Sequence, residues 1–300
     1  MIERILEPHV VPLVHDLSVR RALPRGGRGV GPFIFLDHMG VWNYEPGKSI
    51  DIAPHPHIGL STLTYLFEGE LLHRDSLQTK QLIQPGDVNW MTAGGGVAHS
   101  ERMSPRLANT PHRIHGLQAW VALPAEQEDR PASFTHHPRA SLPEFSIGAI
   151  QYKLIAGEAF GRKSPVETFS PLFYLDVRLG ADSKLVFDPA RQECAFYLIS
   201  GSISVGGNEI ASPQLIIFKT GAKVEFDAKS GTHGVLLGGE SVGPRKIWWN
   251  FVATTQDRIE NAKALWREQK FPRIPEETEF IPLPPETPIT PKGDSPHAKS

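Results

Sequence analysis

The sequence has one cysteine, no long apolar run and no excess of either charge. The 300 residues include only Cys194, which excludes an internal disulfide and favours a reducing compartment. No stretch approaches the roughly 18 apolar residues of a spanning helix. Glu3, Arg4 and Glu7 interrupt the region where a signal peptide would be apolar. These absences predict a cytoplasmic protein that does not enter the membrane.

The charge balance argues against a basic surface that binds nucleic acid. Lys and Arg total 31 against 33 Asp and Glu, a formal net charge of −2, and no block of basic residues occurs. Proteins that bind nucleic acid directly usually carry a basic patch or stripe. The sequence therefore predicts no direct nucleic-acid partner.

Glycine and proline, in contrast, are abundant at 27 residues each. Between them lie short runs rich in β-branched and aromatic residues, such as "IGLSTLTYLF" and "LFYLDVRL". This pattern predicts an all-β protein with many short strands. One helix is expected over about 254–269, opened by a capping box of Thr254 and Asp257. The last 30 residues, 271–300, contain eight prolines, which predicts an extended arm or a disordered tail.

Two β regions resemble each other. "YLFEGEL" at 65–71 matches "YLISGSI" at 197–203, and "QPGDVNWMTAG" matches "ASPQLIIFKTG" at nearly the same offset. The repeat is faint, and coincidence between two hairpins is the alternative. It favours two tandem β-barrels, a first domain over 1–135 and a second over 136–250, followed by the helix and tail at 251–300.

Two pairs of polar residues interrupt apolar strands. His55 and His57 are two residues apart, and so are His99 and Glu101 behind a glycine turn. Because side chains alternate across a strand, each pair projects from one face. Three imidazoles and one carboxylate suit a single divalent transition metal with positions left open for other ligands. Either pair alone is more often a hydrogen-bonded or surface group, and the two together favour a metal site.

The stretches "HPHIGLSTLTYLFEGELLHRDS", "QPGDVNWMTAGGGVAHSE" and "HGLQAWVALP" resemble the N-terminal signature of the pirin family within the cupin superfamily. The resemblance runs from about residue 10 to 270. It implies a bicupin, two facing antiparallel barrels of jelly-roll type, with a metal in the N-terminal barrel only. The family's ligands fall on His55, His57, His99 and Glu101, the same set that the spacing suggests.

The second barrel offers no equivalent ligands. At the repeat's offset of 132 residues, the places of His55 and His57 are taken by Phe187 and Pro189. One histidine, His233, cannot form a site by itself, so this barrel is predicted to be structural. In the first barrel the chain also departs from a common pirin pattern. Ile58 and Gly95 stand where many members have arginine, which removes positive charge near the predicted site.

The resemblance implies two functions. Several pirins are similar to quercetin 2,3-dioxygenases, which open a flavonol ring with O₂ and release CO; here Glu101 would be both ligand and general base. Other members are described as metal- or redox-dependent regulators that bind a transcription factor or metabolic enzyme. The open coordination sphere favours the enzyme. Its expected metal is Fe(II), with Mn, Co, Ni, Cu or Zn as alternatives, and its partners would be a flavonol-like substrate and O₂.

Overall fold

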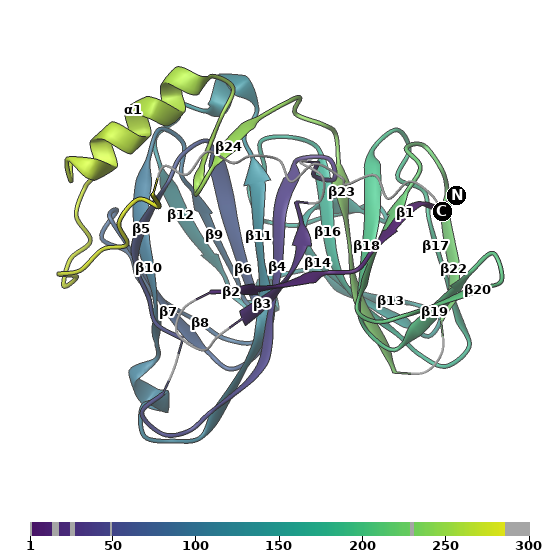
Figure 1. The fold of residues 1–300 in the computed structure, drawn as a ribbon. Helices are drawn as coiled ribbons and strands as arrows, with labels where there is room; N and C mark the ends of the chain where they lie inside the picture. Colours follow the sequence, from purple (N-terminus) through teal and green to yellow (C-terminus); the bar gives the residue numbers. More distant parts are fainter. Residues whose placement is uncertain (1, 14–17, 25–27, 49, 229–230, 286–300) are drawn as a thin grey trace, which may run out of the picture.

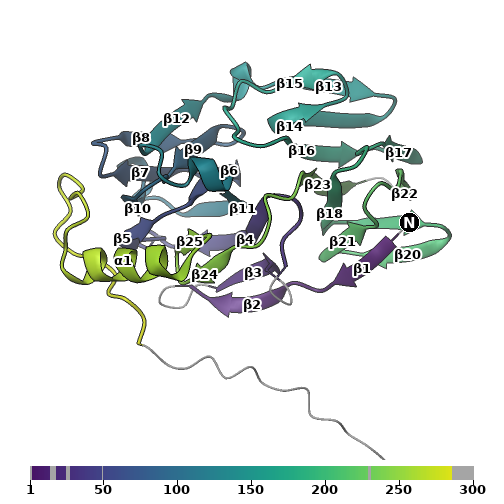
Figure 2. The same cartoon turned by 90° about the horizontal axis from the view of Figure 1, so that it is seen from above.

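A computed structural model describes residues 2–13, 18–24, 28–48, 50–228 and 231–285. Within these ranges strands dominate, and the strands of each sheet pair in antiparallel fashion. This confirms the all-β prediction. Figures 1 and 2 show the strands gathered into two lobes, with one helix on the outside of the lobe formed by the earlier part of the chain.

The first lobe contains a large and a small sheet. The large sheet has seven strands, in spatial order β12 (Ser133–His137), β9 (Val88–Thr92), β6 (Leu60–Glu68), β11 (His112–Ala122), β4 (Phe33–Tyr44), β3 (Ser18–Leu23) and β2 (His9–Pro12). The small sheet has four strands, in the order β5 (Ile52–His57), β10 (Val97–Met103), β7 (Leu71–Asp75) and β8 (Lys80–Ile83).

The second lobe repeats this arrangement. Its large sheet runs β1 (Ile2–Leu6), β21 (Gln214–Phe218), β18 (Glu193–Ser200), β23 (Thr232–Gly239), β16 (Leu172–Leu179), β14 (Ile150–Ala159) and β13 (Glu144–Ile147), with β15 (Arg162–Lys163) beside β14. Its small sheet runs β17 (Ser183–Phe187), β22 (Val224–Ala228), β19 (Ser202–Val205) and β20 (Asn208–Ala211).

The strand orders of the two lobes correspond one to one. β6 takes the place of β18, and β9 takes the place of β21, as the weak sequence repeat predicts. One edge strand comes from a distant part of the chain. β1, at the start of the chain, pairs with β21 in the second lobe. In the first lobe β12, from beyond residue 130, lies beside β9 in the corresponding position. The boundary at residue 135 remains a prediction.

Apolar cores hold the sheets together at three levels. Within the second lobe, Leu175, Phe196, Leu185 and Phe226 belong to one buried cluster that joins its two sheets. A smaller cluster does the same in the first lobe. A third cluster lies between the lobes and joins both large sheets. It includes Leu36 and Leu117 of the first lobe and Tyr174 and Leu237 of the second. The two large sheets therefore pack face to face.

The predicted barrels are not closed. In each lobe the hydrogen-bonded strand path of the described residues ends at edge strands, so each lobe is a sandwich of two sheets. The chain crosses between sheets in tight connections. β5 of the small sheet and β6 of the large one are separated only by Ile58 and Gly59. Gly59 has φ +69°, and a Cβ there would lie 1.9 Å from the carbonyl oxygen of Val252, so the crossing requires glycine.

The helix follows the second lobe but packs on the first. A short hairpin of β24 (Lys246–Trp248) and β25 (Phe251–Ala253) leads into α1 (Gln256–Arg267). Ile259, Ala262 and Trp266 of α1 are buried against Ile58 and Ala98 of the first lobe. Short 3-10 helices lie at Pro105–Leu107, Ala125–Gln127 and Arg139–Ser141.

The structure bears on two sequence predictions for this region. The predicted capping box is wrong: Thr255 is the N-cap without a side-chain cap, and Thr254 instead donates to Glu128 at 2.8 Å. Residues 271–285 form no regular element and lie against the first lobe, whereas the predicted tail's residues 286–300 fall outside the described part. Across the described chain, no helix combines the length and apolarity that crossing a bilayer requires.

Candidate metal centre

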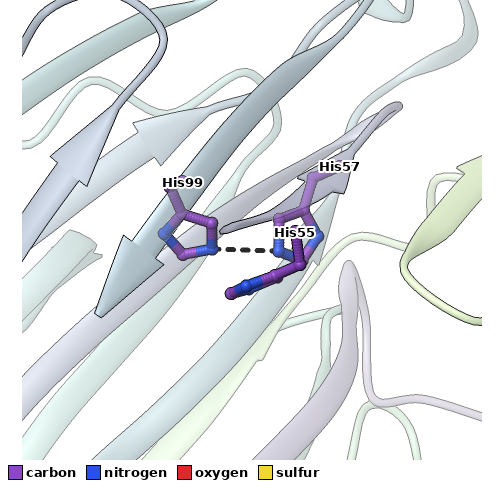
Figure 3. A group of neighbouring side chains, drawn as sticks. All are labelled: His55, His57 and His99. Atoms are coloured by element: carbon purple, nitrogen blue, oxygen red, sulfur yellow. Dashed lines mark hydrogen bonds between the residues drawn. The ribbon is translucent and has the colours of Figure 1, made fainter. Parts of the chain in front are cut away.

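Three histidines meet inside the first sandwich. One side-chain nitrogen from each of His55, His57 and His99 lies within 4.8 Å of the others, and all three side chains are buried. The Nε2 atoms of His57 and His99 are 3.1 Å apart (Figure 3). Figure 3 shows the three rings converging from two neighbouring strands.

The strand pairing explains this convergence. β5 and β10 are antiparallel neighbours, with His99 directly opposite His55. Because alternate residues share a face, His57 joins His55 on the side that faces the sandwich interior. The register shifts between His99 and Glu101, which pairs with Ile52, so β5 carries an extra residue in this interval. Such a bulge re-aims side chains and leaves backbone groups unpaired.

Neighbouring acceptors orient two of the rings. Nδ1 of His55 donates to the carbonyl oxygen of Ala53 at 2.9 Å, which leaves Nε2 of His55 as the lone-pair nitrogen. His73 Nε2 donates to buried Asp75 at 3.0 Å, so His73 Nδ1 can accept from His99 Nδ1 at 3.4 Å. The Nε2 lone pair of His99 then faces the cluster. This assigns His73 the orienting role that metal-binding histidines commonly receive from a neighbour.

The environment keeps these imidazoles neutral. Burial, opposed by the backbone bond to Ala53, lowers the pKa of His55 to about 4. Burial and the proximity of the other histidines hold the pKa values of His57 and His99 well below the ordinary value. A metal ligand must be unprotonated, so the three nitrogens are available at neutral pH.

The residues fit a transition metal. Two nitrogens bound at right angles, each about 2.1 Å from one ion, lie roughly 3.0 Å apart, which is close to the separation of the His57 and His99 nitrogens. Imidazole clusters suit Zn, Cu, Fe and Ni. His55, His57 and His99 are therefore the residues that would hold the ion.

Glu101 lies close by but outside the group of three. It is buried at the wall of the same cavity as His55 and His57. Burial raises the pKa of Glu101 to about 7, against a smaller lowering by the hydroxyl of Thr64. The one hydroxyl proton of Thr64 is donated to Gln118 at 2.9 Å, and Gln118 lines the cavity. That Glu101 is a fourth metal ligand remains a prediction.

A cavity of about 500 Å³ opens beside the histidines. Its walls are mainly aromatic and aliphatic. Phe35 and Trp120 stack with ring centroids 4.1 Å apart, and Trp120 meets the His57 ring edge-on at 5.2 Å. An ion pair of Arg21 with Asp37, bonded at 2.8 and 2.7 Å, adds polar groups to the wall. A large apolar cavity with a few convergent polar groups is typical of a small-molecule site.

Comparison with known proteins shows the family of this chain. Models of pirin and of the pirin C-terminal cupin domain match residues 16–121 and 174–272. A pirin-like protein of Caulobacter vibrioides is 50% identical over 275 residues, which cover 90% of this chain and 95% of that protein. The chain belongs to the pirin family.

Solved structures of similar proteins show the same fold. A quercetin 2,3-dioxygenase from Acinetobacter baumannii matches with a TM-score of 0.87 and 32% identity, over 95% of this chain and 96% of that one. The bacterial pirin YhhW from Escherichia coli, solved in complex with nickel(II), matches at 19% identity with a TM-score of 0.61, over 80% of this chain and 100% of that one. The predicted pirin resemblance is confirmed.

The second sandwich of this pirin is filled where the first holds histidines. Phe187, which corresponds to His55, is buried and pairs across the strands with Val224, as His55 pairs with His99. Pro189 is buried as well. His233 is bonded to Asp176 at 2.6 Å at the face shared by the lobes.

The two departures from the common pirin pattern lie outside the cavity wall. Ile58 is buried in the cluster beneath α1 with Phe251 and Trp266. Gly95 is exposed, and its N–H donates to the carbonyl oxygen of Arg130. Neither residue lines the cavity beside the histidines.

Proposed function

We propose that this pirin is a metal-dependent dioxygenase that opens the heterocycle of a flavonol such as quercetin with O₂ and releases CO. The observation that carries the proposal is the convergence of three neutral imidazoles, of which those of His55 and His57 line an apolar cavity. The quercetin 2,3-dioxygenase of similar fold supports the choice of reaction. When bound, Fe(II) or another transition metal would supply Lewis acidity that favours the deprotonated 3-hydroxyl group.

The cavity walls suit a flat aromatic substrate. The stacked Phe35 and Trp120 offer planar surfaces beside His57, and Trp249 lies on another part of the wall. Contacts of this kind fix the orientation of a ring system and exclude water from it. Gln118 and the Arg21–Asp37 pair are the polar groups that could bind the hydroxyls of the substrate.

Glu101 is the proposed general base. Its carboxylate faces the cavity beside His55 and His57, where it can accept the proton of a substrate hydroxyl. As a metal ligand it would be a weaker base, so it has to leave the metal when it takes the proton.

The test is turnover by iron-loaded protein. Quercetin should be consumed together with O₂, and CO should be released, whereas Glu101→Gln should retain metal and lose at least about a hundredfold in kcat. If the loaded wild-type protein neither consumes O₂ nor releases CO with quercetin, the dioxygenase proposal is wrong for this substrate. Full turnover by Glu101→Gln would remove Glu101 from the role of base.

A further inference from the structure

The C-terminal arm, residues 271–281, follows α1 and returns to the outer face of the two strands that carry the histidines. In Figures 1 and 2 this yellow segment lies beside β5 and β10. Phe271 and Ile274 are buried against Ala98 of β10. Trp266 of α1 donates from Nε1 to the carbonyl oxygen of Ile281 at 2.9 Å, which ties the far end of the arm to the helix.

On β10 the arm binds the residues that alternate with the ligands. Ser100 and Arg102 point outward, since His99 and Glu101 point inward. Glu277 of the arm accepts from Ser100 Oγ at 2.7 Å and from Arg102 Nε at 3.0 Å, and Arg102 also contacts its other oxygen. The Glu277 carboxylate and Ser100 are buried, so this contact is shielded from solvent. Glu277 thus contacts both neighbours of Glu101 from behind, and Arg102 is also bonded to Asp51 and to Glu279 of the arm.

On β5 the arm binds the bulge. β5 is the edge strand of the small sheet, and two of its carbonyl groups near His55 accept hydrogen bonds from groups outside β10. The carbonyl of Ala53 accepts from the His55 ring. The carbonyl of Pro54 accepts from the N–H of Ile281 at 2.8 Å. The residue immediately before His55 is therefore fixed by the arm, and Ile281 itself also lines the cavity beside the histidines.

We propose that the C-terminal arm positions the metal ligands, with Glu277 as the positioning residue for His99 and Glu101 and the Ile281 N–H as the positioning group for His55. The inference rests on the proposed metal centre. Loss of the Glu277 contacts should let β10 shift relative to β5, which would separate the nitrogens of His55, His57 and His99. Groups that orient ligands from behind typically contribute tenfold or more to metal affinity.

The test uses Co(II) alone as a probe, titrated into metal-free full-length protein and followed by its visible absorption. Glu277→Ala should weaken Co(II) binding by about tenfold and change the intensity of the absorption bands, which report coordination geometry. Glu277→Gln, which still accepts from Ser100, should retain part of the affinity. If Glu277→Ala does not fold, Ser100→Ala removes only one bond to Glu277 and should lower Co(II) affinity in the same direction.

The chain offers a matched control in Glu128. This buried carboxylate accepts from the hydroxyl of Thr254 and pairs with Arg245 and Arg258, much as Glu277 binds Ser100 and Arg102, but its partners are not next to a histidine of the cluster. Glu128→Ala and Glu277→Ala should both lower the unfolding temperature, and only Glu277→Ala should weaken Co(II) binding.

Three results would overturn the inference: Co(II) affinity within about twofold of wild type for both Glu277→Ala and Ser100→Ala, an equal loss of affinity for Glu128→Ala, or a wild-type protein that binds no Co(II). Failure of the proposed dioxygenase reaction appears separately, as absent O₂ consumption by loaded wild-type protein with quercetin, and does not enter this comparison.

Discussion

The two sandwiches have the same strand order and different interiors. At one cross-strand pair the first has His55 opposite His99, and the second has Phe187 opposite Val224. Around the phenylalanine pack further rings, including Phe173 with a centroid distance of 4.8 Å. Around the histidines lies a cavity of about 500 Å³. One architecture thus supports a filled core in one copy and, in the other, a mainly apolar cavity with histidines at its wall.

The difference indicates that a metal site requires groups that orient the ligands as well as the ligand side chains themselves. The first sandwich also supplies the Asp75–His73 pair behind His99 and the free carbonyl of Ala53 behind His55. In the second sandwich, the register of β17 with β22 is unbroken across all five paired residues. The shift of register beside His55 therefore has no counterpart in the second sandwich, and apolar side chains fill the interior there.

The largest effect should follow from removing a ligand in the first sandwich. We expect His99→Ala to weaken transition-metal binding by more than about a hundredfold, beyond the loss typical of an orienting neighbour. Metal titration measures this, with His233→Ala as the control in the second sandwich. His233 is bonded to Asp176, so its loss should reduce stability and leave bound metal unchanged. Metal lost from His233→Ala would show that the second sandwich takes part in the site.

Removing a side chain from the filled interior of the second sandwich should lower stability and leave metal binding unchanged. Phe187→Ala removes a buried ring from the second core, and we expect the free energy of unfolding to fall by about 3 kcal/mol. Urea denaturation measures the loss, and elemental analysis should find the wild-type metal content at room temperature. A Phe187→Ala protein that is stable but metal-free would contradict the separation of roles between the sandwiches.

The face shared by the sandwiches predicts a pH dependence. Burial, together with the charges of His115 and Arg20, lowers the pKa of His38 from 6.5 to about 3; its ring is bonded to Tyr197 and His115. The unfolded chain takes up a proton as pH falls through 6.5 and the folded chain does not, so stability is lost in that direction. Lowering the pH from about 8 to about 5 should therefore reduce the free energy of unfolding by roughly 2 kcal/mol through His38.

Denaturation of metal-free wild-type protein and His38→Gln at both pH values measures the contribution of His38. The wild-type protein should lose about 2 kcal/mol more than the variant on acidification. An equal loss for the two proteins would show that His38 is not held neutral by its surroundings.

The smallest predicted effect concerns the ring behind His99. His73→Phe keeps an aromatic ring that can stack on Phe134, as His73 does at 4.5 Å, but removes the nitrogen that accepts from His99. We expect metal affinity to fall by about tenfold, and stability to fall as well, because buried Asp75 loses the His73 donor. Calorimetric titration of the metal-free protein with Zn(II) would show this. Unchanged affinity would mean that the ligand spacing alone orients His99.

Much of the fold and of the histidine cluster could be predicted from the sequence, because both depend on local sequence patterns. Alternation along a strand placed His55, His57 and His99 on inward faces, and the repeated "YLFEGEL" and "YLISGSI" segments identified matching strands β6 and β18. The apolar stripe located α1 to within two residues at each end. The predicted second-copy residues Phe187 and Pro189 are buried, as expected of a filled interior.

What could not be predicted depends on contacts between distant segments. Gln118 and Thr64 lie at polar positions in apolar strands, a weak signal that becomes meaningful only once both strands face the cavity. Thr254 has the sequence of a cap, yet Glu128, far away in the chain, competes successfully for its hydroxyl. The proline-rich arm gave no sign that Glu277 would bind behind the ligands.

The central claim is that one metal ion binds in the first sandwich and none in the second. Elemental analysis of the protein after anaerobic loading with Fe(II) and desalting tests it most directly. The account predicts about one equivalent of iron per chain for wild type and for His233→Ala, and almost none for His99→Ala. Less than about a tenth of an equivalent in wild type, or about one equivalent retained by His99→Ala, would contradict it.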